Sequence, residues 1–357
     1  MKIVRKMKIL SYKIPALLVL GILLFVTQLF AQEDTRRISK SFNIKADTKI
    51  EINNKYGNVI INRWNKNVLE LKVKIEAKGK TSSKTQKILD EIEIDISDRI
   101  SSGKLSIETE IGEIRGNSSF SIHYEISMPD TNPLQLSNSF GNIYMGSYKG
   151  TLEVEVKYGQ FQAEDLDNAN VRIDFSNARC EIETLKSGRL DLRYSKMMIE
   201  DMGDVEITSQ FSDLEIENAG AVKLDGRYGK FKIENIRSLH GDIQFAGLDI
   251  ERLEESIILK TRHGNGINLE QVSNNFTEID IDGQFSSIDI TMESGATARL
   301  NFDLQFGNLK VHGEGINFNK VIKDHNKSEY EGYLGNSNAT SSIRVRTKHG
   351  NIRLDVE

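Results

Sequence analysis

Residues 190–233 read LDLRYSKMMIEDMGDVEITSQFSDLEIENAGAVKLDGRYGKFKI, and Tyr194, Phe211 and Tyr228 follow one another in this stretch at intervals of 17. Each of these residues, called here the marker of its repeat, is followed by Ser or Gly. An aromatic residue or a histidine recurs as the marker at Phe140, Tyr158, Phe175, Tyr194, Phe211, Tyr228, Phe245, His263, Phe285, Phe306 and His349. A repeat of this length indicates stacked structural units, each of which buries its apolar surface against its neighbours.

Apolar residues alternate with polar residues on both sides of the marker, and this is the period of half-buried strands. The fourth residue before the marker is apolar in nearly every repeat, as at Leu190, Ile207 and Leu224. The third and fifth residues after it are also apolar, and they include Ala178 and Cys180. Antiparallel hairpins would not need the same column in every repeat. We therefore predict an all-β fold, a right-handed parallel β-solenoid (β-helix-like) with rungs of about 17 residues.

The positions of the histidines and the cysteine in this pattern indicate whether they could react or bind a metal. We place the marker column on the inner side of the solenoid, so His263 and His349 are expected to be hydrogen-bonded core residues, and Cys180 a small buried hydrophobe. The histidines lack the spacing of a metal site, and no nucleophile, phosphate-loop or dinucleotide motif occurs. The single cysteine excludes a disulfide framework and a cysteine-based zinc cluster. The sequence therefore predicts no catalytic residue, no metal and no cofactor.

The first 31 residues have the features of a secretory signal peptide. Five basic residues precede an apolar run over residues 14–30, and Ala31 stands at the exit. The alternative is an uncleaved anchor, which usually needs ~20 apolar residues. We expect cleavage, which changes the net charge from −5 to −10, and no integral membrane span in the mature chain. The expected location is the periplasm, outer membrane or cell surface of a bacterium.

Four regions follow from these patterns. Residues 1–31 are the signal peptide, and residues 32–135 are expected to form an irregular, β-rich N-terminal cap. That cap includes Tyr56-Gly57, which is similar to the later markers, and one short helix over residues 81–91. Residues 136–318 hold the solenoid repeats. Residues 319–357 are expected to contain an inserted loop or hairpin and the last rung.

The chain resembles a known family at these motifs. The repeated aromatic-Gly/Ser pair, the early Lys55-Tyr56-Gly57-Asn58-Val59 and the closing Thr347-Lys348-His349-Gly350-Asn351-Ile352 are similar to the β-strand-repeat putative adhesins. That family is related to the head-GIN domain of putative autotransporter adhesins. The resemblance covers nearly all of the mature chain and implies an exported, β-helix-like envelope protein. It carries no catalytic signature.

Three classes of function are compatible with such a chain. The first is a non-enzymatic, adhesin-like or structural module of the cell envelope, which the repeats favour. The second is an envelope-stress component that senses or regulates. The third is a polysaccharide-active β-helix enzyme, which would need two carboxylates that converge within several ångströms. No column of the repeat singles out such a pair, and the near-neutral composition gives no reason to expect nucleic acid as a partner.

The candidate partner-binding site consists of basic residues near the C-terminus. No acidic residue occurs between Ile343 and Arg353, so the last rung is expected to present a cluster of positive charge. The candidate residues are Arg344, Arg346, Lys348, Arg353, Lys260 and Arg262. We expect them to contact an anionic envelope component, such as lipopolysaccharide or an anionic glycan, or another envelope protein. The alternative is that these charges only protect an exposed terminal strand from edge-to-edge pairing.

The mature protein is predicted to begin at Gln32, because the small residue Ala31 ends the apolar run. Intact-mass spectrometry of the exported protein tests this. A mass that retains residues 1–31 would establish an uncleaved anchor instead.

Overall fold

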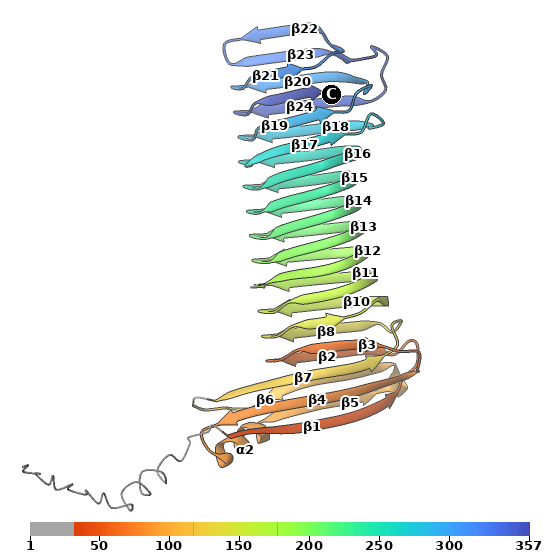
Figure 1. The fold of residues 1–357 in the computed structure, drawn as a ribbon, viewed down its shortest axis with the longest axis vertical. Coiled ribbons are helices and arrows are strands. Elements are labelled where there is room, and N and C mark those ends of the chain that lie inside the picture. The colour runs from red at the N-terminus through yellow and green to blue at the C-terminus, as the bar shows by residue number, and fades with distance from the viewer. Residues whose placement is uncertain (1–31, 117, 177) are drawn as a thin grey trace, which may run out of the picture.

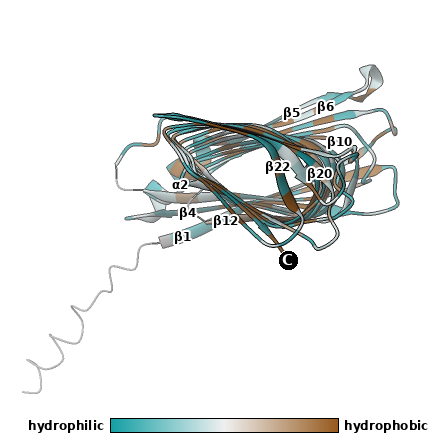
Figure 2. Cartoon of the chain, turned by 90° about the horizontal axis from the view of Figure 1, so that it is seen from above, coloured by the Kyte–Doolittle hydropathy of each residue, from teal (hydrophilic) through white to brown (hydrophobic). Residues whose placement is uncertain are grey.

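A computed structural model describes residues 32–116, 118–176 and 178–357. The predicted signal peptide, residues 1–31, lies outside the described residues. The chain forms a rod of stacked rungs, with an antiparallel cap at its N-terminal end and a hairpin at the other end (Figure 1). Seen along the rod, the rungs superpose (Figure 2). The structure thus confirms the predicted all-β solenoid and its short N-terminal helix.

Long strands form the centre of the rod, and each spans the second half of one rung and the first half of the next. They are β10 (Tyr148–Lys157), β11 (Phe161–Asp174), β12 (Arg179–Arg193), β13 (Lys196–Gln210), β14 (Asp213–Arg227), β15 (Lys230–Gln244) and β16 (Gly247–Arg262). They pair in parallel, and the register places Leu190, Ile207 and Leu224 side by side. Each strand bonds to both neighbours, which explains why proline, lacking an N–H, is absent after Pro133.

The core consists of the predicted apolar columns. The residues four positions before the marker are buried throughout the rungs, as at Leu190, Ile207 and Leu224. One rung corrects the sequence-based alignment, because Cys180 pairs with Met197 and therefore belongs to the third column after the marker. The bend after Phe175 is longer than in the neighbouring rungs, and it leaves Ala178 exposed rather than inward.

Cys180 itself is buried, as expected. The backbone N–H of Phe161 donates to its Sγ at 3.3 Å. Burial raises the pKa of the thiol, and a hydrogen bond to Ser176 opposes that effect only in part. The side chain therefore fills space in the core and stays protonated at neutral pH.

The N-terminal region contributes a rung of its own before it forms the cap. This rung consists of β2 (Lys49–Lys55) and β3 (Val59–Arg63), with Tyr56 at the bend between them. They pair in parallel with β8 (Leu134–Ser139) and β9 (Ile143–Met145), the two strands of the Phe140 rung. Residues 49–63 are therefore part of the solenoid, directly next to the first rung predicted from the repeats.

The cap covers the open side of this first rung. Its elements are β1 (Gln32–Asn43), β4 (Val68–Gly79), α2 (Ser82–Asp90), β5 (Ile92–Arg99), the 3₁₀ turn η1 (Ile100–Ser102), β6 (Lys104–Ile111) and β7 (Ser119–Met128). β6 and β7 pair in parallel with β2 and β3, and antiparallel pairs β7–β4, β4–β1 and β6–β5 then end the parallel stack. In α2, Thr81 is the N-cap residue, and Ile88 and Leu89 are buried. A covered end offers no parallel edge on which a further chain could grow.

The C-terminal end has an order in space that differs from its order in sequence. Its strands are β17 (Gly266–Val272), β18 (Glu278–Gln284), β19 (Ile288–Met292), β20 (Ala298–Gln305), β21 (Leu309–His312), β22 (Ile316–Asp324), β23 (Lys327–Leu334), β24 (Ser342–Lys348) and β25 (Ile352–Val356). β24 lies between β18 and β20, and β25 between β19 and β21. The antiparallel hairpin β22–β23 then covers β20.

The last rung of the sequence is therefore an interior rung of the rod. Both strands of this rung are hydrogen-bonded on both sides, so it has no exposed edge. The expectation that its basic residues protect a terminal edge is wrong for this reason. The segment that carries no marker, residues 319–341, contains most of the covering hairpin.

This position predicts that a charge in the last rung is not tolerated. Val345 is fully buried, whereas Val321 in the covering hairpin is about half exposed. We expect Val345→Asp to lower the free energy of unfolding by more than about 3 kcal/mol, since an unpaired carboxylate would enter the core. Val321→Asp is the matched control and should change it by about 0.5 kcal/mol or less. Thermal unfolding followed by circular dichroism measures both, and equal stability of the two variants would mean that the last rung is peripheral.

Candidate functional site

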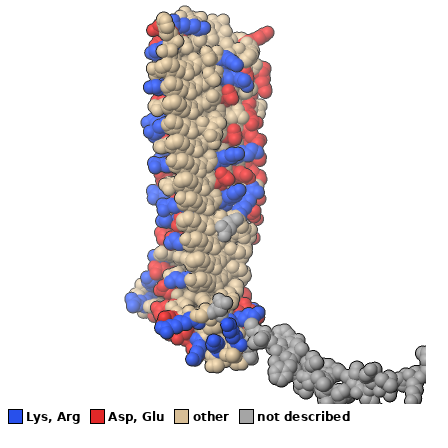
Figure 3. Space-filling model, turned by 90° about the vertical axis from the view of Figure 1, so that its left-hand side faces the viewer, with Lys and Arg blue, Asp and Glu red and all other residues tan. Residues whose placement is uncertain are grey.

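The marker residues form one exposed row of stacked rings along the rod, called here the aromatic ridge. In spatial order its members are Tyr56, Phe140, Tyr158, Phe175, Tyr194, Phe211, Tyr228, Phe245, His263, Phe285, His349 and Phe306. The Tyr and Phe side chains of the ridge are 41–50% exposed. Figure 3 faces this edge of the rod and shows a continuous band of uncharged residues, with Lys and Arg on both sides of it and Asp and Glu among them.

The outward position of the ridge contradicts the expectation that His263 and His349 are core residues. Both are exposed and stacked between phenylalanines. The physical reason is the backbone, since every marker has a positive φ of 50–61°. Among the described residues, the twelve markers are the only non-glycine residues in this left-handed region. A left-handed residue interrupts the strand alternation, so the marker turns outward while its neighbours on both sides continue to alternate into the core.

Backbone hydrogen bonds hold the marker in this conformation. The N–H of Phe211 donates to the carbonyl of Arg227 at 2.9 Å, and the N–H of Tyr228 donates to the carbonyl of Gln244 at 3.0 Å. The same bond joins the other markers to the adjacent rung, except that Phe306 donates to the carbonyl of Asn326 in the covering hairpin. The residue after the marker is small because it turns inward at a tight corner. A Cβ on Gly159 would lie 2.0 Å from the carbonyl oxygen of Gly141.

Ring stacking compensates for the strain of the bend. Adjacent ring centroids lie 4.6–5.2 Å apart, with interplanar angles of 2–10°. A left-handed conformation costs an L-residue about 1–2 kcal/mol, and an aromatic pair returns about 0.5–1.5 kcal/mol. The two terms are therefore similar in size. Because neighbouring rings cover each other's faces, the ridge presents mainly ring edges to solvent.

Polar and apolar rings alternate strictly along the ridge. Every second ring is Tyr or His, and every ring between them is Phe. In sequence order Phe285, Phe306 and His349 break this rule. In space His349 lies between the two phenylalanines, because its rung is inserted there. The alternation therefore follows the order of the rungs in the rod and not their order in the chain.

A column of side chains beside the ridge alternates in the same phase. A cation precedes every Tyr or His marker: Lys55, Lys157, Arg193, Arg227, Arg262 and Lys348. A residue without positive charge precedes every Phe marker: Ser139, Asp174, Gln210, Gln244, Gln284 and Gln305. These six cations, called here the cation row, recur at every second rung, about 10 Å apart at the usual strand spacing.

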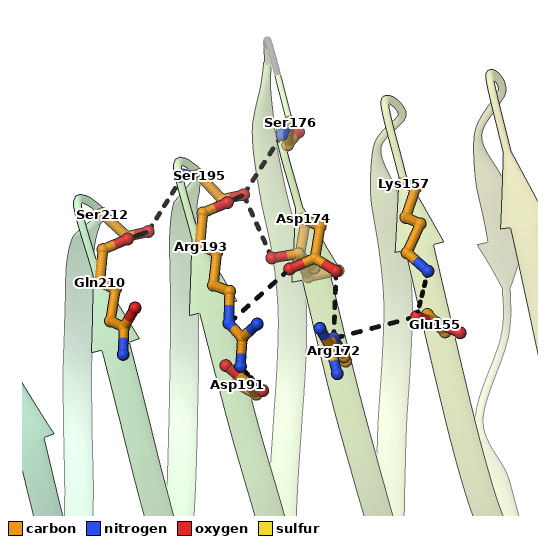
Figure 4. A network of polar contacts seen from close by, with 11 residues as sticks. Glu155, Lys157, Arg172, Asp174, Ser176, Asp191, Arg193, Ser195, Gln210 and Ser212 are labelled. Carbon is orange, nitrogen blue, oxygen red and sulfur yellow. Dashed lines mark hydrogen bonds and ion pairs between the residues drawn. The ribbon is translucent and has the colours of Figure 1, made fainter.

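Acidic residues pair with the cation row from positions further from the bend. Lys157 contacts Glu155 at 2.7 Å, and Arg193 contacts Asp191 at 3.3 Å (Figure 4). The side chains of Lys157 and Arg193 remain 43% and 39% exposed. Exposed pairs of this kind contribute about 0–1 kcal/mol each, so they leave the cations available to other anions.

Asp174 is the one acidic residue of its column, and it is almost fully buried. Arg172 donates to its Oδ2 at 3.0 Å, and Nε of Arg193 lies 4.0 Å from its Oδ1 (Figure 4). Burial acts against the charge of Arg172, but the hydrogen bond and the charge of Asp174 outweigh it and raise the pKa of Arg172. This cluster fixes the bend of the Phe175 rung, where Ser195 also bonds to the backbone N–H of Ser176.

The strand that follows the ridge carries a column of glutamates on its outer side. It contains one residue from each of seven successive rungs: Glu164, Glu183, Glu200, Glu217, Glu234, Glu251 and Glu270. Lys232 pairs with Glu251 at 2.7 Å. A groove on this face is lined by Glu164, Glu183 and Glu200 together with Tyr144. Within the described part of the chain, no group of His, Cys, Asp and Glu side chains is arranged to hold a metal ion.

The structure separates the basic residues that the sequence singles out. Arg344 and Arg346 both form ion pairs with Asp280 of the neighbouring strand, at 3.4 and 3.2 Å. Lys260 lies in register with Asp242 and Asp282. The absence of acids within the last rung is therefore offset by acids from the rungs beside it.

Three of the predicted cations lie elsewhere. Arg262 and Lys348 belong to the cation row, and Arg262 contacts Asp242 at 3.0 Å. Arg353 lies on the opposite side of the bend, in register with Asp289 and Lys310. The predicted residues thus do not form one cluster. Two of them, Arg262 and Lys348, belong to the longer row that the sequence already shows as the column before the Tyr and His markers.

The comparisons with known proteins found solved structures with two kinds of name, putative adhesion proteins and a putative lipid binding protein. No family model and no curated protein matches the chain. A solved putative adhesin from Parabacteroides merdae is 9% identical, with a TM-score of 0.35, over 71% of this chain and 92% of its own. A putative cell adhesion protein from Clostridium sporogenes is 13% identical, with a TM-score of 0.22, over 91% and 100%.

A putative lipid binding protein from Parabacteroides distasonis is 10% identical, with a TM-score of 0.29, over 89% of this chain and 96% of its own. The names of the first two structures agree with the family that the sequence motifs resemble. At such identities and TM-scores the likeness carries no functional weight. No helix in the described chain is both long enough and apolar enough to cross a membrane.

The strained bend predicts an unusual order of stability at the ridge. Tyr194 has φ 50° and stacks on Phe175 and Phe211. Tyr194→Ala should lower the free energy of unfolding by about 1–3 kcal/mol, because it loses both stacking contacts and keeps the strain. Tyr194→Gly loses the same contacts but relieves the strain, so it should be about 1 kcal/mol more stable than the Ala variant.

Asp249, an exposed residue in an extended strand, provides the control for this order. There the Ala variant should be more stable than the Gly variant by about 0.5–1 kcal/mol. Thermal unfolding of the four variants measures both orders of stability. If the Ala variant is more stable than the Gly variant at both positions, the bend is not under the strain described here.

Proposed function

We propose that this protein is an exported, non-enzymatic interaction module of the bacterial cell envelope, with an adhesin-like role, and that the aromatic ridge is its contact surface. The observation that carries the proposal is the ridge itself, a row of exposed rings that continues through all the rungs of the rod. Long exposed apolar features are uncommon on soluble proteins and usually mark a site of contact with a partner.

The repetition of the ridge supports binding to an extended partner. Each rung presents the same groups at the same spacing, so contacts that are weak singly add up along the rod. The left-handed backbone conformation of every marker supports the same interpretation, because residues held in strained conformations concentrate at functional sites. A binding role therefore uses the property that distinguishes this molecule, a long and uniform edge.

Only part of the predicted basic site belongs to the proposed contact surface. Lys348 and Arg262 flank the ridge and contribute to its contact surface. Arg344 and Arg346 are held by Asp280 and do not extend it. Export is supported by the signal-like segment, residues 1–31, and by the resemblance to envelope adhesins.

The test removes rings without changing the bend. In the triple variant Tyr194→Asn, Phe211→Asn and Tyr228→Asn, the new residue tolerates the left-handed conformation. We expect the protein that begins at Gln32 to co-sediment with envelope fragments, and the ridge variant to bind about tenfold less because it loses contacts from three rungs.

The matched control places the same substitutions on another face of the same rungs. Met198→Asn, Glu215→Asn and Lys232→Asn lie on the outer side of the following strand. This variant should bind like the unmodified protein. Equal binding by the ridge variant and the unmodified protein would show that the contact surface lies elsewhere.

A further inference from the structure

We propose that the aromatic ridge docks edge-on against an anionic phospholipid surface. The rings would lie at the level of the headgroups, and the cation row would contact the lipid phosphates. This inference rests on the proposed function, in which the ridge is the contact surface, and it names the partner of that surface.

The shape of the ridge fits a flat partner. The bends of successive rungs align along one edge of the rod (Figure 1), and the marker residues stand at these bends. Eleven steps of about 4.8 Å give an edge of about 53 Å. A convex edge touches a planar surface along its whole length, whereas single small ligands prefer concave pockets.

The exposed parts of the rings suit a lipid headgroup region. A sugar that stacks on an aromatic side chain needs a free ring face, and both faces of the ten inner rings are covered by neighbours at 4.6–5.2 Å. The edges that remain exposed are apolar in Phe and carry a hydroxyl or a ring nitrogen in Tyr and His. Amphipathic rings of this kind are enriched where a membrane meets water.

The charges next to the ridge are complementary to phosphate. The cation row stands one residue before the Tyr and His markers, so its side chains can place their apolar stems along the rings and their charged ends at the surface. On the other side of the ridge, the second residue after the marker is an amide at Asn58, Asn142, Gln160, Asn265, Asn351 and Asn308. In three central rungs it is Lys196, Asp213 and Lys230, and the carboxylate of Asp213 lies 3.8 Å from the amine of Lys196. Hydrogen-bond donors and a net positive charge therefore line the edge.

Asp174, which is almost fully buried, and Asp213 stand at the ridge, and the other acidic residues of these rungs lie further from the edge. Glu155, Asp191 and Asp225 stand two residues before the cation row, and the glutamate column lies six to eight residues after the marker of the same rung. An anionic surface would repel that glutamate face. The protein can therefore approach such a surface with the ridge foremost and not with the face that carries the glutamates, which fixes the orientation of docking.

Vesicle binding tests this inference. The protein that begins at Gln32 should co-sediment with phosphatidylcholine vesicles that contain phosphatidylglycerol, and bind pure phosphatidylcholine weakly. Arg227→Glu with Arg262→Glu should reduce binding to the anionic vesicles by about tenfold or more, and high salt should reduce binding by the unmodified protein. Both arginines pair only with exposed carboxylates, so the exchange leaves the buried Asp174 cluster intact. The control, Lys223→Glu with Lys232→Glu, makes the same change of charge away from the ridge and should bind within about twofold of the unmodified protein.

Three results would overturn the inference. Equal binding to neutral and anionic vesicles would remove the role of the cation row. Equal loss in both double variants would indicate a dependence on net charge alone. Binding to a soluble anionic polysaccharide, for which polygalacturonate is the probe, without binding to vesicles would assign the ridge to glycans.

The ridge triple-asparagine variant separates this inference from the proposed function. If that variant loses binding to envelope fragments while the unmodified protein ignores vesicles, the ridge is a contact surface whose partner is not a phospholipid. If it binds both envelope fragments and vesicles like the unmodified protein, the proposed function and the lipid partner both fail.

Discussion

The distance between hydrogen-bonded strands determines how the side chains of adjacent rungs interact. Because the strands are parallel and in register, every residue stands about 4.8 Å from the residue of the same column in the next rung. That distance is close to the separation at which aromatic rings stack, so a column of rings is stabilising. It is also short enough for like charges to repel. The column of seven glutamates is therefore unfavourable for folding, and Lys232 offsets part of that repulsion at Glu251.

The ridge is at once a structural element and a surface. The marker backbone is strained, and its N–H bonds to the next rung and its ring stacks on both neighbours. Glycine would remove the strain at every bend, yet the ring occupies the position in all twelve. Stacking alone only about balances the strain. The exposed edge that results is the property that the proposed contact with a partner uses.

The inserted C-terminal rung shows that the alternation of rings follows the order of the rungs in space and not their order in the sequence. The chain passes from β19 to β20 with one rung omitted, and β24 and β25 later fill that space. With His349 in place, the rings alternate without interruption and the cation row continues to Lys348. A chain that simply ended the stack with its last rung would place two phenylalanines side by side.

The sequence alone determined the strands, the period of 17 and the inward columns, because alternation over strands and spacing between rungs are both local patterns. It did not determine the side on which the markers lie, because the alternation of a strand is interrupted at a left-handed residue. The interruption is visible around Tyr194, where Leu192, two residues before it, and Ser195, one residue after it, are both buried. Nor did the sequence identify Tyr56 as a rung or Arg344 as paired with Asp280. Those facts depend on which distant segments become neighbours, and only the tertiary structure decides that.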